Sequence, residues 1–331
     1  MMLNTTGNTT LMGSSPLPST LFRVMFWCSL GVVEAFSLLG NAIIIYIITT
    51  HKNLHTSTNW FLLSLAISDL GVPLFIIPSH LLCTETELSC NIGVTNALYN
   101  FILFASVLNL CACTTERYIA ILHPFKYIHL VNQKRVVAVL IKVWSLPLPM
   151  SILPVILIPN PKPGESVLVN RIYWLTQVAL FMIIPSAVML AAFWRIHRVA
   201  TWHANQIRRL SLVPEEDAHG GRQKLVSEAK STLKVYGVVV LVFTLGWLLS
   251  AYRMIKKNFL LHHVPIEVDY ISRFLLVSNA SINPYIYGLQ KSDIKKEFLT
   301  VLRKRHTPQP PSSASNVNSG HDVLRNDTDT V

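Results

Sequence analysis

Charged residues are scarce in this sequence: they make up 14% of its 331 residues, while 51% are hydrophobic. A typical soluble domain carries about 25% charged residues, so the deficit predicts long uncharged stretches rather than a larger soluble core. The five cysteines include no paired Cys-x-x-Cys spacing, which argues against a zinc site. The apolar stretches hold neither a Gly-x-Ser-x-Gly nucleophile motif nor a His/Glu metal pair. The sequence therefore predicts a membrane protein that is not an enzyme.

Seven apolar stretches are long enough to cross a membrane. A helix needs roughly 20 apolar residues to span the hydrocarbon, and it pairs its backbone polar groups internally. The last stretch is the least apolar, because Glu267, Asp269 and Arg273 lie in its first third. The predicted fold is an all-α integral membrane protein, a seven-transmembrane helix bundle at 24–290 after a leading segment at 1–23. The stretches are 24–50, 60–82, 92–121, 136–158, 172–193, 235–252 and 266–289.

A short amphipathic eighth helix is predicted at 291–302, where Ile294, Phe298 and Leu302 alternate with basic side chains. Such a helix lies on the lipid surface. The tail at 303–331 is rich in Pro, Ser and Asn and is predicted to be disordered in the cytosol. Its last four residues, Thr-Asp-Thr-Val, can add a strand to a PDZ-type domain, although many such tails end this way by chance.

Basic residues indicate how the bundle is oriented. The segments 51–59, 117–135, 195–234 and the tail after 289 hold 20 of the 28 Lys and Arg residues. Because basic loops stay in the cytosol, the N-terminus is predicted to be extracellular, in the plasma membrane. Two glycosylation sequons, at Asn4 and Asn8, fit that side. The net charge of +11 then reflects cytosolic loops, and no nucleic-acid partner is predicted.

Asp69 is the one acidic residue of the second stretch, and polar residues of other stretches can meet it in a bundle core. An ionisable group inside a membrane is costly and marks a functional site by default. A carboxylate with neutral oxygen donors suits a small hard cation such as sodium. A buried polar network that only fixes helix packing explains the same residues. The polar residues in question are Asn41, Ser106, Asn109, Asn279 and Asn283.

The triplet Glu116-Arg117-Tyr118 ends the third stretch on the cytosolic side. A Glu can hold a neighbouring Arg until that Arg moves to another partner, which is the electrostatic basis of a two-state switch. An interfacial Arg that extends toward water explains the same residues. Near the end of the seventh stretch, Pro284 permits a helix kink, and Asn283 can pair the backbone groups that the kink frees.

These motifs, one in each predicted helix and in this order, resemble the rhodopsin-like (class A) G-protein-coupled receptor family. The match covers about residues 24–302. The motifs are Gly40-Asn41, Leu65-Ala66-x-x-Asp69, Glu116-Arg117-Tyr118, Trp144, Pro185, Phe243-x-x-x-Trp247 and Asn283-Pro284-Tyr285-Ile286-Tyr287, followed by Phe298 in the eighth helix.

The resemblance implies a receptor that transduces an extracellular ligand signal to heterotrimeric G proteins by helix rearrangement. It implies no cofactor beyond an allosteric sodium ion, and arrestin and receptor kinases as further partners. Phe125 would contact the G protein together with Arg117, and 208–211 (Arg-Arg-Leu-Ser) looks like a kinase site. The implied activation switch comprises Glu116, Arg117, Tyr118, Phe243, Trp247, Asn283, Pro284 and Tyr287. The implied sodium site comprises Asp69, Ser106, Trp247, Asn279 and Asn283.

Three departures from the family pattern affect this interpretation. The predicted loop 159–171 has no cysteine, so the usual disulfide to helix three cannot form, and a local Cys83–Cys90 link is the remaining option. Leu249 replaces the sixth-helix proline, so Gly246 would supply flexibility instead. Phe193 replaces a fifth-helix tyrosine and removes a hydroxyl from the active-state network. A receptor-like protein that no longer signals therefore stays open as an alternative; a transporter or channel fits less well, since no duplicated halves appear.

The ligand is not identified by the sequence. Tyr99 stands where monoamine receptors carry an aspartate, and Val277 where opsins carry a lysine, so neither a typical monoamine nor retinal is predicted. Basic residues near the outer helix ends would favour an anionic ligand or an acidic peptide. They would equally pair internally, as Asp269 with Arg273 one turn away or Glu34 with Arg273. The pocket candidates are Tyr99, Asn100, Trp247, Arg253 and Arg273.

Overall fold

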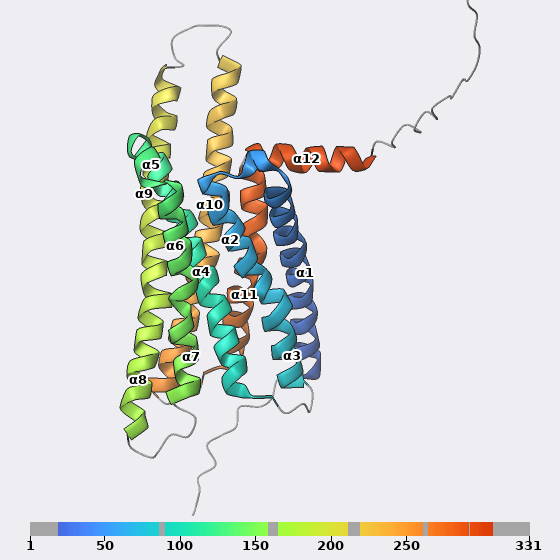
Figure 1. The fold of residues 1–331 in the computed structure, drawn as a ribbon, viewed down its shortest axis with the longest axis vertical. Helices are drawn as coiled ribbons and strands as arrows, with labels where there is room; N and C mark the ends of the chain where they lie inside the picture. The colour runs from blue at the N-terminus through green and yellow to red at the C-terminus, as the bar shows by residue number, and fades with distance from the viewer. Residues whose placement is uncertain are drawn as a thin grey trace, which may run out of the picture.

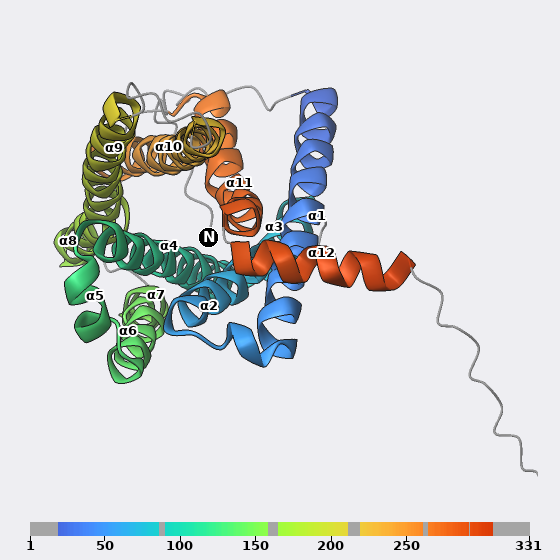
Figure 2. The ribbon, with the colours of Figure 1, turned by 90° about the horizontal axis from the view of Figure 1, so that it is seen from above.

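Seven helical rods run side by side, and an eighth helix lies across one end of the bundle (Figures 1 and 2). The computed structural model describes residues 19–85, 90–157, 165–210, 219–260, 264–290 and 292–306, and all regular structure in these ranges is helical. Four rods are single helices, and three are built from consecutive helical segments. The single helices are α1 (Thr20–Thr50), α4 (Ile92–Leu122), α10 (His219–Ile255) and α11 (Ile266–Gln290).

The composite rods change their helical geometry at or next to prolines. The second rod is α2 (Ser57–Gly71), the π-helical turn η2 (Val72–Ile76) and α3 (Ile77–Glu85), and Pro73 lies in that turn. The fourth rod consists of α6 (Gln133–Ser145) and α7 (Pro147–Leu157). The fifth rod consists of α8 (Glu165–Val178), the π-helical turn η3 (Ala179–Ile183) and α9 (Ile184–Leu210), and Pro185 is the second residue after the end of η3. Proline has no amide hydrogen and its ring displaces the preceding carbonyl, so the wider turn accommodates it. Shorter segments are η1 (Lys52–Leu54), α5 (Pro124–Leu130) and η4 (Lys256–Leu260).

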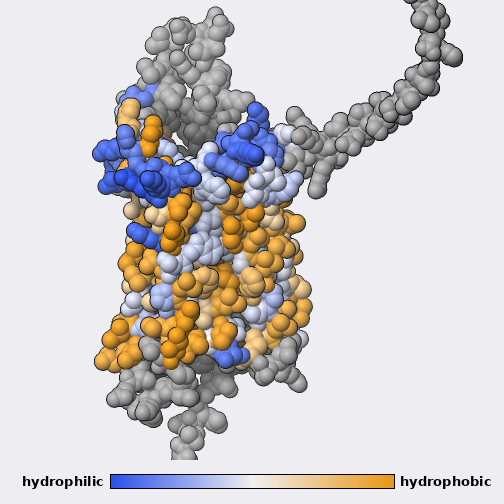
Figure 3. Space-filling view, viewed as in Figure 1, coloured by the Kyte–Doolittle hydropathy of each residue, from blue (hydrophilic) through white to orange (hydrophobic). Residues whose placement is uncertain are grey.

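The outer surface of the rods is apolar, as a lipid-facing surface must be. Side chains such as Leu39, Ile141 and Leu241 are more than half exposed. A band of hydrophobic residues covers the visible face, and hydrophilic residues gather at the end that carries α12 (Figure 3). Six of the described rods are long and apolar enough to cross a membrane. The seventh rod, α11, carries Glu267 and Asp269 in its first turn. These charged residues are the reason that its stretch was the least apolar one in the sequence.

The helices extend beyond the predicted apolar stretches, chiefly at the end of the bundle that carries α12. Helix α9 continues to Leu210 and helix α10 begins at His219, whereas the corresponding predicted stretches end at 193 and begin at 235. Hydropathy identifies only the part of a helix that lies in hydrocarbon, and an amphipathic helix can continue beyond that part into water. In the same way the eighth helix, α12 (Ser292–His306), runs four residues past the predicted end at 302. Its Ile294 is 1% exposed and anchors α12 to the bundle core.

Candidate functional site

Asp69 lies at the centre of a buried polar group that joins three rods. Its side chain is fully buried. Ser106 on α4 donates a hydrogen bond to Oδ1 at 2.6 Å, and Asn283 on α11 donates one to Oδ2 at 2.8 Å. Both carboxylate oxygens therefore have a donor, which lowers the cost of burying this group in the membrane. The structure thus brings Asp69, Ser106 and Asn283 together, as the sequence predicted.

Asn109 and Asn41 were also expected beside Asp69, but the structure directs their amides elsewhere. Asn109 accepts a hydrogen bond from Ser64 at 2.7 Å and donates to the carbonyl of Ala105 at 3.0 Å. The indole of Trp144 donates to the same Ser64 hydroxyl at 2.9 Å, so this group ties together the second, third and fourth rods. Asn41 donates to the carbonyl of Ala280 at 3.2 Å. In this structure the two residues therefore join or stabilise helices and do not contact Asp69. The sequence of one span does not fix which side of the bundle interior each amide faces.

Two buried amide oxygens on α11 make the site suitable for a cation: that of Asn283, whose amide is bonded to Asp69, and that of Asn279, one helical turn before it. Asn279 and Asn283 are 4% and 1% exposed, and within the described residues their Oδ1 atoms have no hydrogen-bond donor. Amide carbonyls and carboxylates are the ligands that hard monovalent and divalent cations prefer. Trp247, the remaining member of the predicted sodium group, is 3% exposed and packs beside Phe243, with ring centroids 6.2 Å apart. The residues present therefore fit a small hard cation.

At the C-terminal end of α4, Glu116 is held by hydroxyl groups from two other segments. Its Oε1 accepts hydrogen bonds from Thr58 at 2.9 Å and from Tyr127 at 2.6 Å. Burial and the adjacent Glu116 carboxylate raise the pKa of Tyr127 to about 12, so the hydroxyl keeps its proton at neutral pH and can donate. From the sequence, Arg117 was predicted to pair with Glu116, and Thr58 and Tyr127 were not identified as its hydrogen-bond donors. No spacing rule connects these positions, since three separate segments meet there.

Other residues of the predicted activation switch and G-protein contact lie near the same end of the bundle. The hydroxyl of Tyr118 accepts a hydrogen bond from Arg195 on α9 at 3.2 Å. Phe125, on α5, is 93% exposed, an unusual state for an aromatic side chain in water and one that suits contact with a partner. Pro284 lies within α11 against Gly40 on α1. The side chains of Tyr287 and of residues 208–210, as well as Ser211 and the sequons at Asn4 and Asn8, lie outside the described residues.

Gly246, which is predicted to supply flexibility, lies at a close contact between two helices. The helix α10 runs through this position without interruption. A methyl group at Gly246 would lie 3.2 Å from Cβ of Leu275 and 3.3 Å from the Leu275 carbonyl carbon. The glycine therefore allows α10 and α11 to approach closely. Gly237 likewise allows α10 to approach α9, because a methyl group there would lie 3.0 Å from the ring of Phe193.

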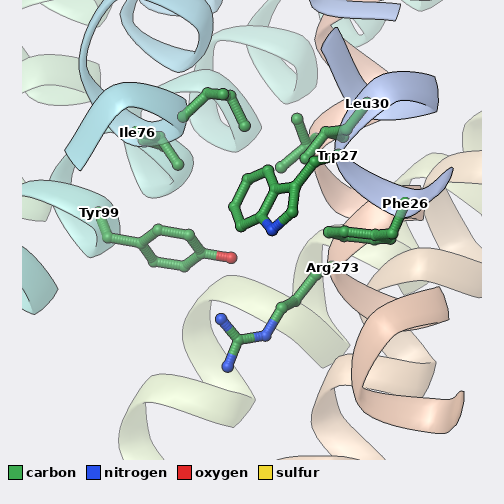
Figure 4. Close-up of a pocket in the computed structure, with 8 residues that line it drawn as sticks. Phe26, Trp27, Leu30, Ile76, Tyr99 and Arg273 are labelled. Carbon is green, nitrogen blue, oxygen red and sulfur yellow. The ribbon is translucent and has the colours of Figure 1, made fainter. Parts of the chain in front are cut away.

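A small outer cavity lies between α1, the second rod, α4 and α11. Of the predicted pocket residues, Tyr99 and Arg273 line it, whereas Asn100, Trp247 and Arg253 do not. Trp27 on α1, together with Tyr99 and Arg273, points into the same space (Figure 4). The cavity measures about 20 Å³, which is room for roughly one water molecule. Trp247 lies deeper, because it is packed among the aromatic rings of the core.

The charges beside this cavity are paired internally. Asp269 accepts from Arg253 at 2.7 Å and from Arg273 at 2.9 Å. The predicted pairing of Asp269 with Arg273 is confirmed, while the alternative pairing of Glu34 with Arg273 does not form: both carboxylate oxygens of Glu34 have no hydrogen-bond donor among the described residues. Near the same end, a disulfide joins Cys83 and Cys90, the local link that remained open in the sequence.

Comparison with known proteins decides the family. Residues 40–287 match the family described as 7 transmembrane receptor (rhodopsin family). This chain belongs to that family. It is a G-protein-coupled receptor with seven membrane-spanning helices, as its motifs indicated.

The receptor resembles proteins named for several different ligands. It is 27% identical to the alpha-1A adrenergic receptor of Rattus norvegicus, over 87% of this chain and 70% of the relative. The D(1)-like dopamine receptor of Takifugu rubripes is 28% identical, with 88% and 72% covered. The adenosine receptor A2a of Canis lupus familiaris is 25% identical, with 82% and 70% covered. Because these relatives are named for both amines and a nucleoside, similarity does not identify this receptor's ligand.

Proposed function

We propose that this receptor lies in the plasma membrane with its N-terminus outside, and passes an extracellular ligand signal through a heterotrimeric G protein inside. The observation that carries the proposal is the construction of the cytosolic end of α4. There the buried Glu116 is hydrogen-bonded to Tyr127 on α5. On the same short helix, Phe125 is almost fully exposed. A partner that binds Phe125 would act directly on the element that holds Glu116, and so would couple binding to the bundle.

Arg117→Ala should reduce basal second-messenger output to that of cells without the receptor. The reason is that the residue next to Glu116 is the implied switch contact for the G protein. The measurement is cyclic AMP and calcium in cells that express wild type or variant at equal surface level, before any ligand is chosen. Lys134→Ala, which removes an exposed cation at the start of α6, is the matched control and should signal like wild type. If wild type differs from mock cells in no pathway, the receptor-like protein without signalling becomes the better description.

We further propose that a sodium ion binds at Asp69. Asp69, Ser106, Asn279 and Asn283 would hold the ion, which would supply a positive charge to a carboxylate buried in the membrane. An ion that binds one conformation better than another shifts the population toward it, so sodium would act as an allosteric ligand. The support is the pair of buried amide oxygens beside Asp69 that have no donor within the described residues.

Asp69→Asn should abolish the stabilisation of the purified receptor by sodium. Wild type should unfold at a higher temperature in sodium chloride than in N-methyl-D-glucamine chloride of equal ionic strength, because an ion that binds only the folded state stabilises that state increasingly as its concentration rises above the dissociation constant. The variant should unfold at the same temperature in both salts. A wild type that is insensitive to sodium would contradict the site.

The remaining partners are proposals that rest on the family and on the tail. Receptor kinases and arrestin would act on the cytosolic loops, including the Arg-Arg-Leu-Ser sequence at 208–211. A PDZ-type protein would take the C-terminal Thr-Asp-Thr-Val. The ligand enters from the end where the outer cavity lies, and the internal pairing of Asp269 with Arg253 and Arg273 reduces the attraction that these arginines would exert on an anion.

A further inference from the structure

Glu34 is a second acidic residue in the membrane-spanning part of the bundle, and no motif of the family includes it. It lies near the middle of α1 and is 4% exposed. Neither carboxylate oxygen has a hydrogen-bond donor within the described residues. A buried carboxylate that is neither paired nor hydrogen-bonded is costly in a low-dielectric interior. Such a group either holds a proton or binds a positively charged species that the protein's own side chains do not supply.

The position of Glu34 connects the outer cavity to the Asp69 site. Leu30, one helical turn outward on the same face of α1, and Trp27, two turns outward, line that cavity (Figure 4). Going inward, the same face carries Ser37, which is fully buried. Glu34 is also close enough to Asp69 for the two carboxylates to interact electrostatically. Along α1, Glu34 therefore lies one turn inward of the cavity lining and within electrostatic range of Asp69.

The groups around Glu34 leave it without a compensating charge. The second rod contributes Asp69, whose carboxylate repels that of Glu34. The seventh rod contributes Arg273 on the outer side, but that side chain is bonded to Asp269 at 2.9 Å. Because the cavity has room for about one water molecule, the species that reaches Glu34 in this conformation must be small.

We propose that Glu34 is an outer carboxylate ligand of the same small monovalent cation that binds at Asp69, or of a second one directly above it. The proposal rests on the proposed sodium site. Two buried carboxylates of equal charge raise each other's energy, and a cation close to both removes that repulsion while satisfying oxygens that no protein donor reaches. Glu34 would thereby set the affinity of the receptor for sodium and the route by which the ion enters from the extracellular side.

The test uses the full-length receptor in lipid nanodiscs, with sodium alone as the probe. Thermal unfolding is followed while sodium chloride replaces N-methyl-D-glucamine chloride at constant ionic strength, for wild type, Glu34→Gln, Glu34→Asp and Asp69→Asn. Glu34→Gln should raise the sodium concentration at half-maximal stabilisation by about tenfold or more. Without sodium it should unfold at the same temperature as wild type or higher, because the amide carries no charge to be buried. Glu34→Asp keeps the carboxylate and should keep a clear sodium response.

The outcomes separate this inference from the proposed sodium site. An unchanged sodium midpoint in Glu34→Gln, with the melting temperature shifted equally in both salts, would mean that Glu34 is only a packing residue and would overturn the inference. A wild type that shows no sodium response would overturn both proposals. Loss of the response in Glu34→Gln but not in Asp69→Asn would leave Glu34 as a cation ligand and remove Asp69 from the site.

Discussion

Gly40→Ala should lower the stability and surface expression of the receptor sharply. A methyl group at this position would lie 2.6 Å from Cγ and 3.0 Å from Cβ of Pro284, closer than carbon atoms approach in proteins. The proline ring is rigid and lies within α11, so neither helix can yield cheaply. Overpacking of this kind costs roughly 1–3 kcal/mol. That cost exceeds the gain of up to about 1 kcal/mol that alanine normally brings to a helix interior.

Gly31→Ala provides the matched control, because it makes the same change in the same helix. A methyl group at Gly31 meets no atom within 4 Å, so this variant should match wild type or be slightly more stable. The measurement is the melting temperature of purified protein together with surface expression in cells. If Gly40→Ala and Gly31→Ala behave alike, the close approach of α1 to Pro284 does not contribute to stability.

The role of Gly40 illustrates what the sequence could and could not predict. The Gly40-Asn41 motif was recognisable, and the apolar stretches located all seven rods because the bilayer imposes a length that composition reveals. The reason for the glycine, contact with a proline more than two hundred residues away, appears only when α1 and α11 are packed together. The pairing of Asp269 with Arg273 was predictable because it is local to one helix face.

The buried polar residues show the same division. That Asp69 would need donors followed from its burial, and Ser106 and Asn283 supply them. That Asn109 would instead join the second, third and fourth rods through Ser64 and Trp144 depends on helix rotation. A stretch that is apolar on nearly every face does not encode its rotation. Glu34 was considered in the sequence only as an alternative partner for Arg273, because its burial without a hydrogen-bond donor depends on how α1 packs against the other rods.

Tyr127→Phe should raise basal signalling several-fold at equal surface expression. The Tyr127 hydroxyl donates to the Glu116 carboxylate at 2.6 Å, and its pKa of about 12 keeps it protonated at neutral pH. A hydrogen bond to a charged group contributes about 1.5–3 kcal/mol, which is roughly a 10- to 150-fold change in an equilibrium constant if the bond exists in one conformation only. Because the bond ties α5 to the end of α4, its loss should release the segment that carries the G-protein contact Phe125.

The three hydroxyl and carboxylate groups should act as one unit. Thr58 donates to the same oxygen of Glu116 at 2.9 Å and lies 2.7 Å from the Tyr127 hydroxyl, so Thr58→Val should also raise basal output. The double variant should fall short of the combined effect of the two single changes, as expected for residues that share a partner. Tyr46→Phe, which removes the hydroxyl of a tyrosine 55% exposed on the outside of α1, should leave cyclic AMP and calcium unchanged. A basal signal that falls in Tyr127→Phe would mean instead that the bond stabilises the signalling conformation, since a contact can favour only the state in which it is made.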